Sequence, residues 1–143
     1  MFIGEYTVSM DNKGRIAIPA RFRSVLNAAA VITRGLDKSL FIYSKSEWEK
    51  IAQKLASLPL SQANSRAFSR LMLAGAYELE FDKQGRVNIP DSLRQFGSLT
   101  KKVVVAGLYN RIELWDEKAW ELYKQTTEKE SNAIAEALGQ LGV

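Results

Sequence analysis

An internal repeat is the feature of this sequence that most limits its possible folds. Residues 11–23 read DNKGRIAIPARFR and residues 82–94 read DKQGRVNIPDSLR, which match at an offset of 71. Further matches continue in the same order, with an offset of 71 upstream and 72 downstream: Gly4 with Gly75, Tyr6 with Tyr77, Gly35-Leu36 with Gly107-Leu108 and Trp48-Glu49 with Trp120-Glu121. We call residues 1–71 repeat 1 and residues 72–143 repeat 2.

The size of the repeat favours one core shared by both copies. A folded chain of 16.0 kDa buries roughly 68% of its surface, whereas a half of about 8 kDa buries only roughly 62%, which is marginal. Two copies are also too few for a solenoid, which needs at least three. We therefore expect a single interlocked domain over residues 1–143, with pseudo-twofold symmetry between the repeats.

Each repeat begins with a predicted hairpin followed by a short helix. Alternating apolar residues predict strands over residues 6–10 and 77–81. Each is followed by the motif Asp-x-x-Gly-Arg, in which Asp bonds its own backbone and Gly supplies a positive φ, as a tight turn requires. We call residues 11–15 turn 1 and residues 82–86 turn 2. A second strand follows each turn, at 16–18 and 87–89, and proline then starts short helices at 20–27 and 91–96.

The remainder of each repeat predicts two more strands and longer helices. The strands are expected at 30–34, 39–43, 102–106 and 111–115. Ser44 and Glu47 have the spacing of a capping box before an apolar stripe of Trp48, Ile51 and Leu55. A further helix is expected over 61–74. In repeat 2 we expect Asp116 to cap a helix, and a last stripe at Ile134, Leu138 and Leu141. The fold class is therefore α+β, with helical stripes that pack in the core or between subunits.

The absence of two residue types excludes several kinds of chemistry. The chain has no Cys and no His, which excludes disulfides, thiol nucleophiles, Ser-His-Asp catalysis and the commonest metal ligands. It has no phosphate-cradling Gly-rich loop and no membrane-length apolar run. An enzyme has only the Ser-Lys spacing of Ser98 and Lys101 in its favour, without the partner motifs. We expect no catalytic residues, no metal, no cofactor, no small-molecule substrate, no membrane partner, and a cytoplasmic setting.

The repeated turns are candidates for contact with nucleic acid. An arginine at a tight turn can present its planar donor fork to phosphate or to a guanine edge. Lys13, Arg21 and Arg23 lie near Arg15 in the sequence, and repeat 1 carries 11 Lys and Arg against 5 Asp and Glu, a balance of +6. Repeat 2 carries 9 against 11, a balance of −2. Asp and Arg four residues apart also fit a purely structural pair across each hairpin, and that alternative stays open.

Several segments together resemble one known protein family. These are MFIGEYTVSMDNKGRIAIPARFR, ITRGLDKSLFIY, RAFSRLMLAGA, DKQGRVNIP and NRIELWDEKAWE. In combination they are similar to the MraZ family over nearly the whole chain. The resemblance implies two AbrB/MazE-type swapped hairpins, which interlock into one small β-barrel with helices outside it.

The resemblance also implies a function. Members are bacterial transcriptional regulators that bind short direct repeats in the promoter of their own division and cell-wall gene cluster, associate with the nucleoid and form ring-shaped homo-oligomers. The family's DNA-contacting Asp-x-x-x-Arg motif corresponds here to Asp11 with Arg15 and to Asp82 with Arg86. We therefore expect a DNA-binding repressor with double-stranded DNA and further copies of itself as partners.

The expected DNA-binding residues combine the motif with its basic neighbours: Asp11, Lys13, Gly14, Arg15, Arg21, Arg23 and Arg86, with Asp82 and Gly85 as further candidates. Because DNA carries dense negative charge, we expect turn 1 to face it and repeat 2 mainly to complete the barrel or ring. The alternative is an oligomeric, antitoxin-like module that binds an acidic protein.

Overall fold

The fold combines a large antiparallel sheet with short and long helices, in the α+β class that the sequence predicts. The computed structural model describes residues 1–27 and 29–142. The strands are β1 (Phe2–Ser9), β2 (Arg15–Ala17), β3 (Ala30–Arg34), β4 (Leu40–Ser44), β5 (Tyr77–Leu79), β6 (Arg86–Asn88), β7 (Lys102–Tyr109) and β8 (Ile112–Asp116). The helices are α1 (Ala20–Leu26), α2 (Lys45–Ala56), α3 (Ala63–Ser69), a π-helical η1 (Arg70–Ala74), α4 (Asp91–Phe96), α5 (Glu117–Lys129), α6 (Ser131–Ala137) and a 3₁₀ turn η2 (Gly139–Leu141).

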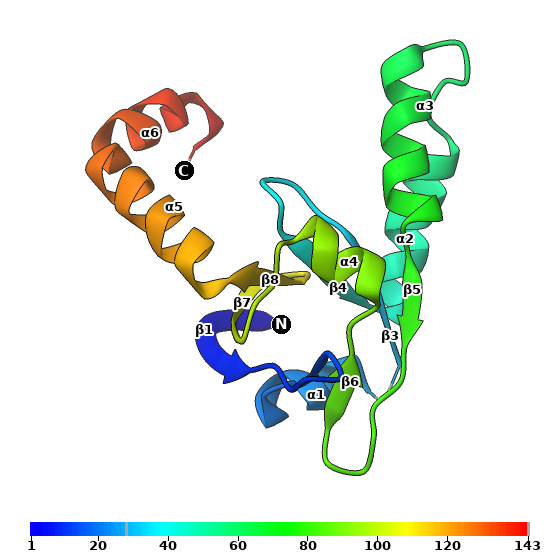
Figure 1. The fold of residues 1–143 in the computed structure, drawn as a ribbon. Helices are drawn as coiled ribbons and strands as arrows, with labels where there is room; N and C mark the ends of the chain where they lie inside the picture. The colour runs from blue at the N-terminus through cyan, green and yellow to red at the C-terminus, as the bar shows by residue number, and fades with distance from the viewer. Residues whose placement is uncertain (28, 143) are drawn as a thin grey trace.

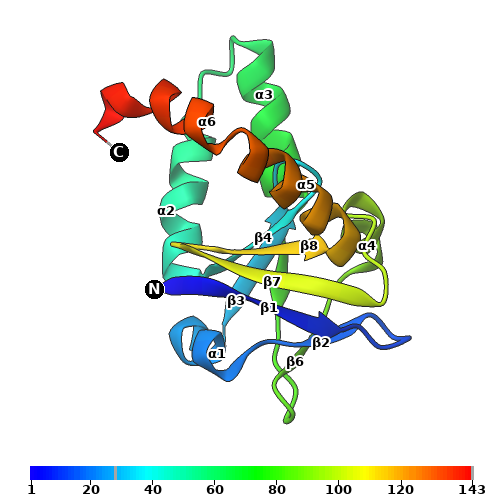
Figure 2. The same cartoon turned by 90° about the vertical axis from the view of Figure 1, so that its left-hand side faces the viewer.

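Strands from the two repeats alternate in pairs within the main sheet. Its order is β1-β7-β8-β4-β3-β5, and every neighbouring pair is antiparallel. Since β5, β7 and β8 of repeat 2 correspond to β1, β3 and β4 of repeat 1, this order reads the same from either edge. The central pair, β4 with β8, joins the two repeats (Figure 2).

A second, two-stranded sheet also joins the repeats. β2 pairs with β6 in an antiparallel register that sets Ile16 opposite Val87. Within the described residues the six-stranded sheet ends at β1 and β5, without ladder pairing between these two edges. The sheets are therefore not closed, and the swapped-hairpin barrel that the family resemblance implies is not confirmed.

The central strands are buried on both faces. On one face, Ile32, Ile42, Val105 and Leu114 join the main core, which also holds residues of β2, β6, α1 and α4. The next residues along the strands point to the other face, as strand geometry requires. There, Phe41 and Tyr43 pack with α2 residues, and Val104, Ala106 and Trp115 pack with Trp120 of α5. Burial on both faces explains the near-continuous apolar runs of these strands.

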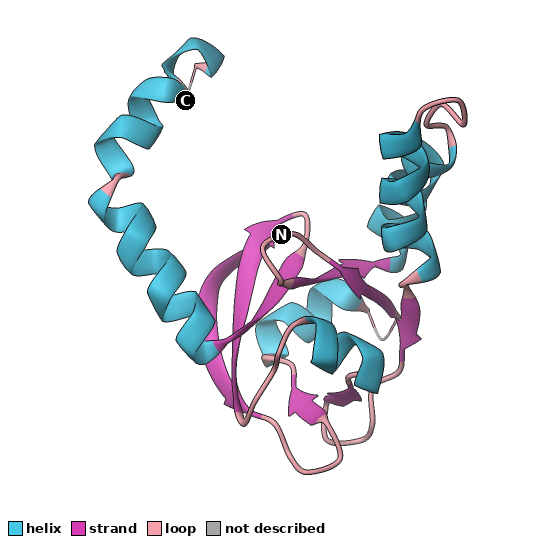
Figure 3. Ribbon diagram, turned by 45° about the horizontal axis from the view of Figure 1, so that its top comes forward, coloured by secondary structure: helices cyan, strands magenta, loops and turns pink. Residues whose placement is uncertain are grey.

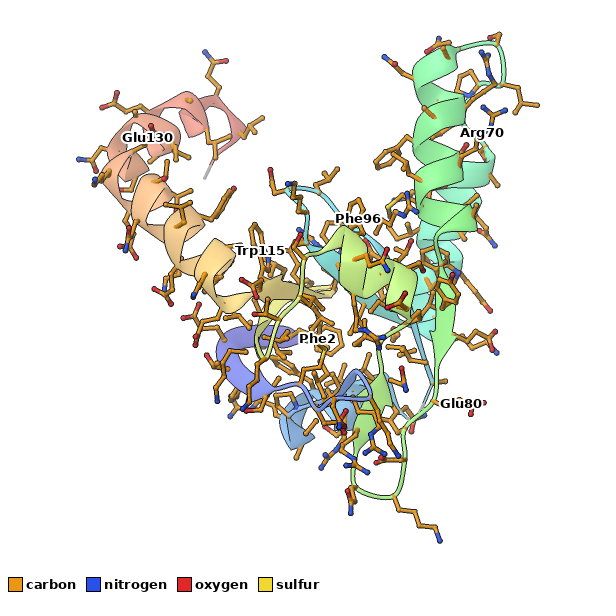
Figure 4. The ribbon with its side chains drawn as sticks, in the orientation of Figure 1. Phe2, Arg70, Glu80, Phe96, Trp115 and Glu130 are labelled. Carbon is orange, nitrogen blue, oxygen red and sulfur yellow. The ribbon has the colours of Figure 1, made fainter. Side chains whose placement is uncertain are left out.

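The longer helices extend beyond this body as two arms. One consists of α2 and α3 and the other of α5 and α6, and both project from the same end of the molecule (Figures 1 and 3). Figure 4 places Phe2 in the body, whereas Arg70 and Glu130 lie out on the arms. α3, α5 and α6 contain no buried residue among those described. Phe68 of α3, Leu71 of η1 and Leu122 of α5 stay more than a third exposed, whereas Trp120 of α5 is partly buried against the sheet.

Several predicted boundaries are wrong in detail. The first strand begins at Phe2 rather than at residue 6, and it pairs along its length with β7. The predicted hairpin of this strand with β2 is therefore wrong, because β2 pairs with β6 in the other sheet. The predicted helix over 61–74 is α3 followed by the π-helical η1. Ser44 caps α2 as predicted, with Oγ accepting from Glu47 N at 3.3 Å. Asp116 precedes α5 as predicted, but its carboxylate accepts from the Thr100 backbone and hydroxyl instead of capping the helix.

The structural match between the repeats also differs from the sequence match at one place. Ala30 pairs with Ser44 in repeat 1, and Val103 pairs with Asp116 in repeat 2. Ser44 and Asp116 are 72 apart whereas Ala30 and Val103 are 73 apart, so β3 corresponds to β7 at an offset of 73. The matched Gly35 and Gly107 are therefore not equivalent, because the connection between the two strands is one residue shorter in repeat 2.

Candidate nucleic-acid interface

Turn 1 is held together by the carboxylate of Asp11. Its Oδ1 accepts from the backbone N–H of Lys13 at 3.0 Å and of Arg15 at 2.9 Å, and its Oδ2 accepts from Arg15 Nε at 2.7 Å. Gly14 has φ +82°, a region that favours glycine, and its N–H donates to the Asp11 carbonyl at 3.0 Å. The local chemistry predicted from the motif is therefore present.

Turn 2 has the same construction. Asp82 Oδ1 accepts from the backbone of Gln84 at 2.8 Å and of Arg86 at 2.9 Å, and its Oδ2 accepts from Arg86 Nε at 2.8 Å. Gly85 has φ +74°. The Asp–Arg pair that the spacing allowed thus exists in both turns. Each arginine side chain nevertheless stays 30% exposed, so part of its donor fork is accessible to a partner.

The two carboxyl groups titrate below the ordinary range of Asp. The backbone N–H of Arg15 is the largest cause that lowers the pKa of Asp11, and the Arg15 side chain and the Lys13 backbone add to it. The Arg86 backbone N–H likewise lowers the pKa of Asp82, aided by the Arg86 side chain and the Gln84 backbone. Partial desolvation opposes the shift in both. Hydrogen bonds to the charged form therefore keep both groups ionised.

The pairing of β2 with β6 brings the two motifs together. Arg86 Nη1 lies 3.9 Å from Asp11 Oδ2, across the boundary between the repeats. Asp82, Arg86, Asp11 and Arg15 thus form one row of alternating charges with no net charge. Any net positive potential at this surface must come from residues around the row.

The remaining candidates lie in different surroundings. Lys13 and Arg21 are exposed, Lys13 on turn 1 and Arg21 on α1. Arg23 is partly buried, and its Nη1 donates to the Ile18 carbonyl at 3.2 Å. A Cβ built on Gly85 would overlap this guanidinium, so Arg23 lies directly against turn 2. The structure therefore brings Asp11, Arg15, Asp82 and Arg86 together and sets Arg23 against the glycine of turn 2.

Two further lysines lie beside turn 1, and the sequence argument missed them. β1 leads into turn 1 and pairs with β7, so Ser9 stands opposite Lys102 and Met10 N donates to the Lys101 carbonyl at 2.8 Å. Lys102 Nζ also bonds Ser9 Oγ at 2.9 Å. Both lysines belong to repeat 2, so only the strand pairing places them at turn 1.

Turn 2 has different neighbours. β5 leads into it and pairs with β3, where Leu79 stands opposite Ala30 and Glu78 opposite Val31. Exposed Glu80 follows on the same segment, and Figure 4 shows it on the stretch that leads down to turn 2. β7, which pairs with the strand before turn 1, therefore contributes lysines. β3, which pairs with the strand before turn 2, contributes alanine, and the segment before turn 2 itself carries glutamates.

Within residues 1–27 and 29–142, no group of three or more Asp, Glu, His or Cys side chains is arranged to hold a metal ion. The helices of the described chain are all too short or too polar to cross a membrane.

A family model and a similar protein of known name point to the same family. A family model for the MraZ protein, described as antitoxin-like, matches residues 1–71 and again residues 72–141. A protein of Halothermothrix orenii named Transcriptional regulator MraZ is 52% identical over 143 residues, which cover the whole of both chains. Among solved structures, PHS018 from Pyrococcus horikoshii aligns with 79% of this chain and 96% of its own, with 14% identity and a TM-score of 0.35.

Proposed function

This chain belongs to the MraZ family, and on that premise we propose that it is a sequence-specific DNA-binding transcriptional repressor. It acts on the promoter of its own division and cell-wall gene cluster, where it binds direct repeats as a ring-shaped homo-oligomer. It is not an enzyme, and it works in the cytoplasm in association with the nucleoid.

The observation that carries this proposal is the collection of basic groups around turn 1. Lys13 and Arg15 on the turn are joined there by Lys101 and Lys102 from the other repeat. The partly exposed guanidinium of Arg15 suits a guanine edge, because its planar fork can donate two parallel hydrogen bonds. The lysines suit phosphates, which position the protein without reading sequence. Turn 1 is therefore proposed to contact the DNA bases, and turn 2 is proposed to contribute less to DNA binding.

The two helical arms support the assembly part of the proposal. Both arms carry exposed apolar residues. These are Phe68 on α3, Leu71 on η1, Leu122 on α5 and Leu138 directly after α6. The arms project from one end of the molecule, while turn 2 projects from the opposite end (Figure 1). Contacts between arms of neighbouring copies would bury these side chains and leave the turns accessible to DNA.

The test is binding of the purified full-length protein to labelled DNA from upstream of its own gene, with scrambled DNA of equal length as control. We expect tighter binding to the native sequence, and a log affinity that falls linearly with log salt by about 0.9 per phosphate neutralised. Equal affinity for both DNAs would contradict sequence-specific binding. A weak salt dependence together with capture of an acidic protein partner would favour the antitoxin-like module instead.

A further inference from the structure

Arg94 of α4 lies against turn 1, although it belongs to the other repeat. Its Nη1 donates to the Ile89 carbonyl at 2.7 Å and reaches the Lys13 carbonyl of turn 1 at 3.4 Å. A Cβ built on Gly14 would overlap this Nη1, so the absence of a side chain at Gly14 makes room for the guanidinium. Asp91 Oδ1 accepts from Nη2 at 3.2 Å and fixes the orientation of the fork.

Arg23 has the reciprocal position. It belongs to α1 of repeat 1, donates to the Ile18 carbonyl and lies against Gly85 of turn 2. The backbone repeats this crossed pattern, since Ile89 N donates to the Gly14 carbonyl at 2.9 Å and Ile18 N to the Gly85 carbonyl at 3.2 Å. Each turn is therefore held by a helix arginine and a strand from the opposite repeat.

We call the helix arginine and the strand that hold each turn from the opposite repeat its crossed clamp. The clamp on turn 1 has more contacts than the clamp on turn 2. The Lys13 carbonyl faces two side-chain donors, Arg94 Nη1 and Asn88 Nδ2, the latter at 3.3 Å. The residues of repeat 1 that match Asn88 and Asp91 at an offset of 71 are Ala17 and Ala20, which carry no polar side chain. Turn 1 is thus the more firmly held of the two turns.

We propose that Arg94 and Arg23 are positioning residues, each of which fixes the Asp-x-x-Gly-Arg turn of the opposite repeat, and that Arg94 presets turn 1 for DNA. Arg23 then acts on turn 2 instead of contacting DNA itself. A turn that is already in its bound conformation loses less conformational entropy on binding, so the affinity for DNA is higher. The role of Arg94 in DNA binding rests on the proposed function, whereas the role of the two arginines in holding the turns depends only on the contacts described.

Hydrogen–deuterium exchange in the absence of DNA tests the crossed clamp directly. Arg94→Ala should speed amide exchange in residues 11–15 roughly fivefold and leave residues 82–86 unchanged, and Arg23→Ala should do the opposite. Each variant is the matched control for the other. General destabilisation would instead speed exchange in both turns equally, and that result, or no change in either turn, would overturn the clamp.

A double-mutant cycle checks the same contact through stability. Gly14→Ala should raise the unfolding equilibrium constant less in the Arg94→Ala background than in the native protein, because the added methyl group then has room. The two changes should depart from additivity by about threefold or more. Gly14→Ala combined with Arg23→Ala should be additive, since these groups belong to different turns. Equal coupling in both pairs, or none in either, contradicts the crossed arrangement.

Binding to the upstream DNA tests the role of Arg94 in DNA binding. We expect Arg94→Ala to weaken binding roughly tenfold without changing the slope of log affinity against log salt. Arg94→Lys should not restore affinity, because a single ammonium group lacks the planar fork. A slope reduced by about one unit would identify Arg94 as a phosphate contact and overturn the positioning role. If the native protein also fails to bind this DNA, the proposed function fails, while the exchange and stability results still decide the clamp.

Discussion

At the scale of single residues, the two turns depend on carboxylates that accept hydrogen bonds from their own backbone. Asp11 and Asp82 each accept two backbone N–H groups and one arginine Nε. Motif chemistry predicts these local contacts, since Asp, Gly and Arg lie within five residues of one another. The contacts of Arg94 with turn 1 and of Lys101 with the neighbouring Met10 were not predictable in this way, because they join residues about 80 to 90 positions apart that only the fold brings together.

Acidification should loosen both turns. The folded pKa values of Asp11 and Asp82 lie below the ordinary 3.8. Each carboxylate therefore stabilises its turn fully above pH 3.8, and this contribution is lost as the pH falls through the lowered folded value. NMR titration of the side-chain carboxyl carbons should give both midpoints below 3.8.

The same titration in Arg15→Ala separates the causes of the shift. The midpoint of Asp11 should stay below 3.8, because the largest cause is the backbone N–H of residue 15, which the variant keeps. A midpoint at or above 3.8 in the native protein would contradict the hydrogen-bond pattern described for turn 1.

Arg15→Ala and Arg86→Ala should differ in their effect on DNA binding. Loss of a bidentate base contact costs about 1–3 kcal/mol and relaxes sequence preference. We expect this loss for Arg15, which has Lys101 and Lys102 beside its turn, and a smaller loss for Arg86, which has Glu78 and Glu80. The measurement is affinity for the upstream DNA.

Lys13→Ala is the control for Arg15→Ala. It should weaken binding to all sequences alike and reduce the salt slope by about one unit. The oligomeric state of every variant is checked by ultracentrifugation. Equal losses for Arg15→Ala and Arg86→Ala in intact oligomers would show that both turns touch DNA, against the asymmetry argued from charge.

At the scale of elements, one buried hydroxyl ties the sheet to the first helical arm. Thr33 of β3 is fully buried, and its Oγ1 donates to the Met72 carbonyl in η1 at 2.6 Å. Thr33→Val keeps the shape and removes the donor, which leaves a buried carbonyl without this partner. Urea unfolding should show a loss of about 1–3 kcal/mol. Thr7→Val, at an exposed position on β1, is the control and should change stability by no more than about 0.5 kcal/mol.

Most elements were predictable, but not their pairing. Alternation, turn residues and prolines indicated β2, β6, α1 and α4 closely. No local signal in the sequence predicts the order β1-β7-β8-β4-β3-β5, because the backbone of each strand could form the same hydrogen bonds with a different neighbouring strand. The offset of 73 between β3 and β7 likewise depends on the length of the connection from β7 to β8. The sequence match of Gly35-Leu36 with Gly107-Leu108 gives an offset of 72 and so does not reveal it.

At the scale of the whole molecule, neither repeat should fold alone. Among the described residues, the ladder between β3 and β4 lies within repeat 1, whereas β1, β2, β3 and β4 each pair with a strand of repeat 2. A fragment of residues 1–71 would expose these edges and half of the core. We expect it to be unfolded or aggregated by circular dichroism and light scattering. A soluble fragment that unfolds cooperatively in urea would contradict a single interlocked domain.

The intact protein should form closed homo-oligomers. Its helical arms expose apolar residues that the body does not cover, among them Leu60, Leu122 and Leu141. A regulator that reads tandem DNA repeats also gains affinity from linked copies, because each further contact becomes intramolecular. Light scattering at micromolar concentration should report a multiple of the 16.0 kDa chain mass. A monomer at that concentration would contradict the ring.

The palindromic strand order has a consequence for how such a chain could arise and diverge. Two identical single-repeat chains with this strand order would form a symmetric dimer, in which any substitution appears in both turns at once. Joining them in one gene removes that constraint. Lys101 and Lys102 could then be acquired beside one turn while glutamates accumulated beside the other, without disturbing the shared framework. The fused chain can therefore hold two different surfaces, which a symmetric dimer of identical repeats could not.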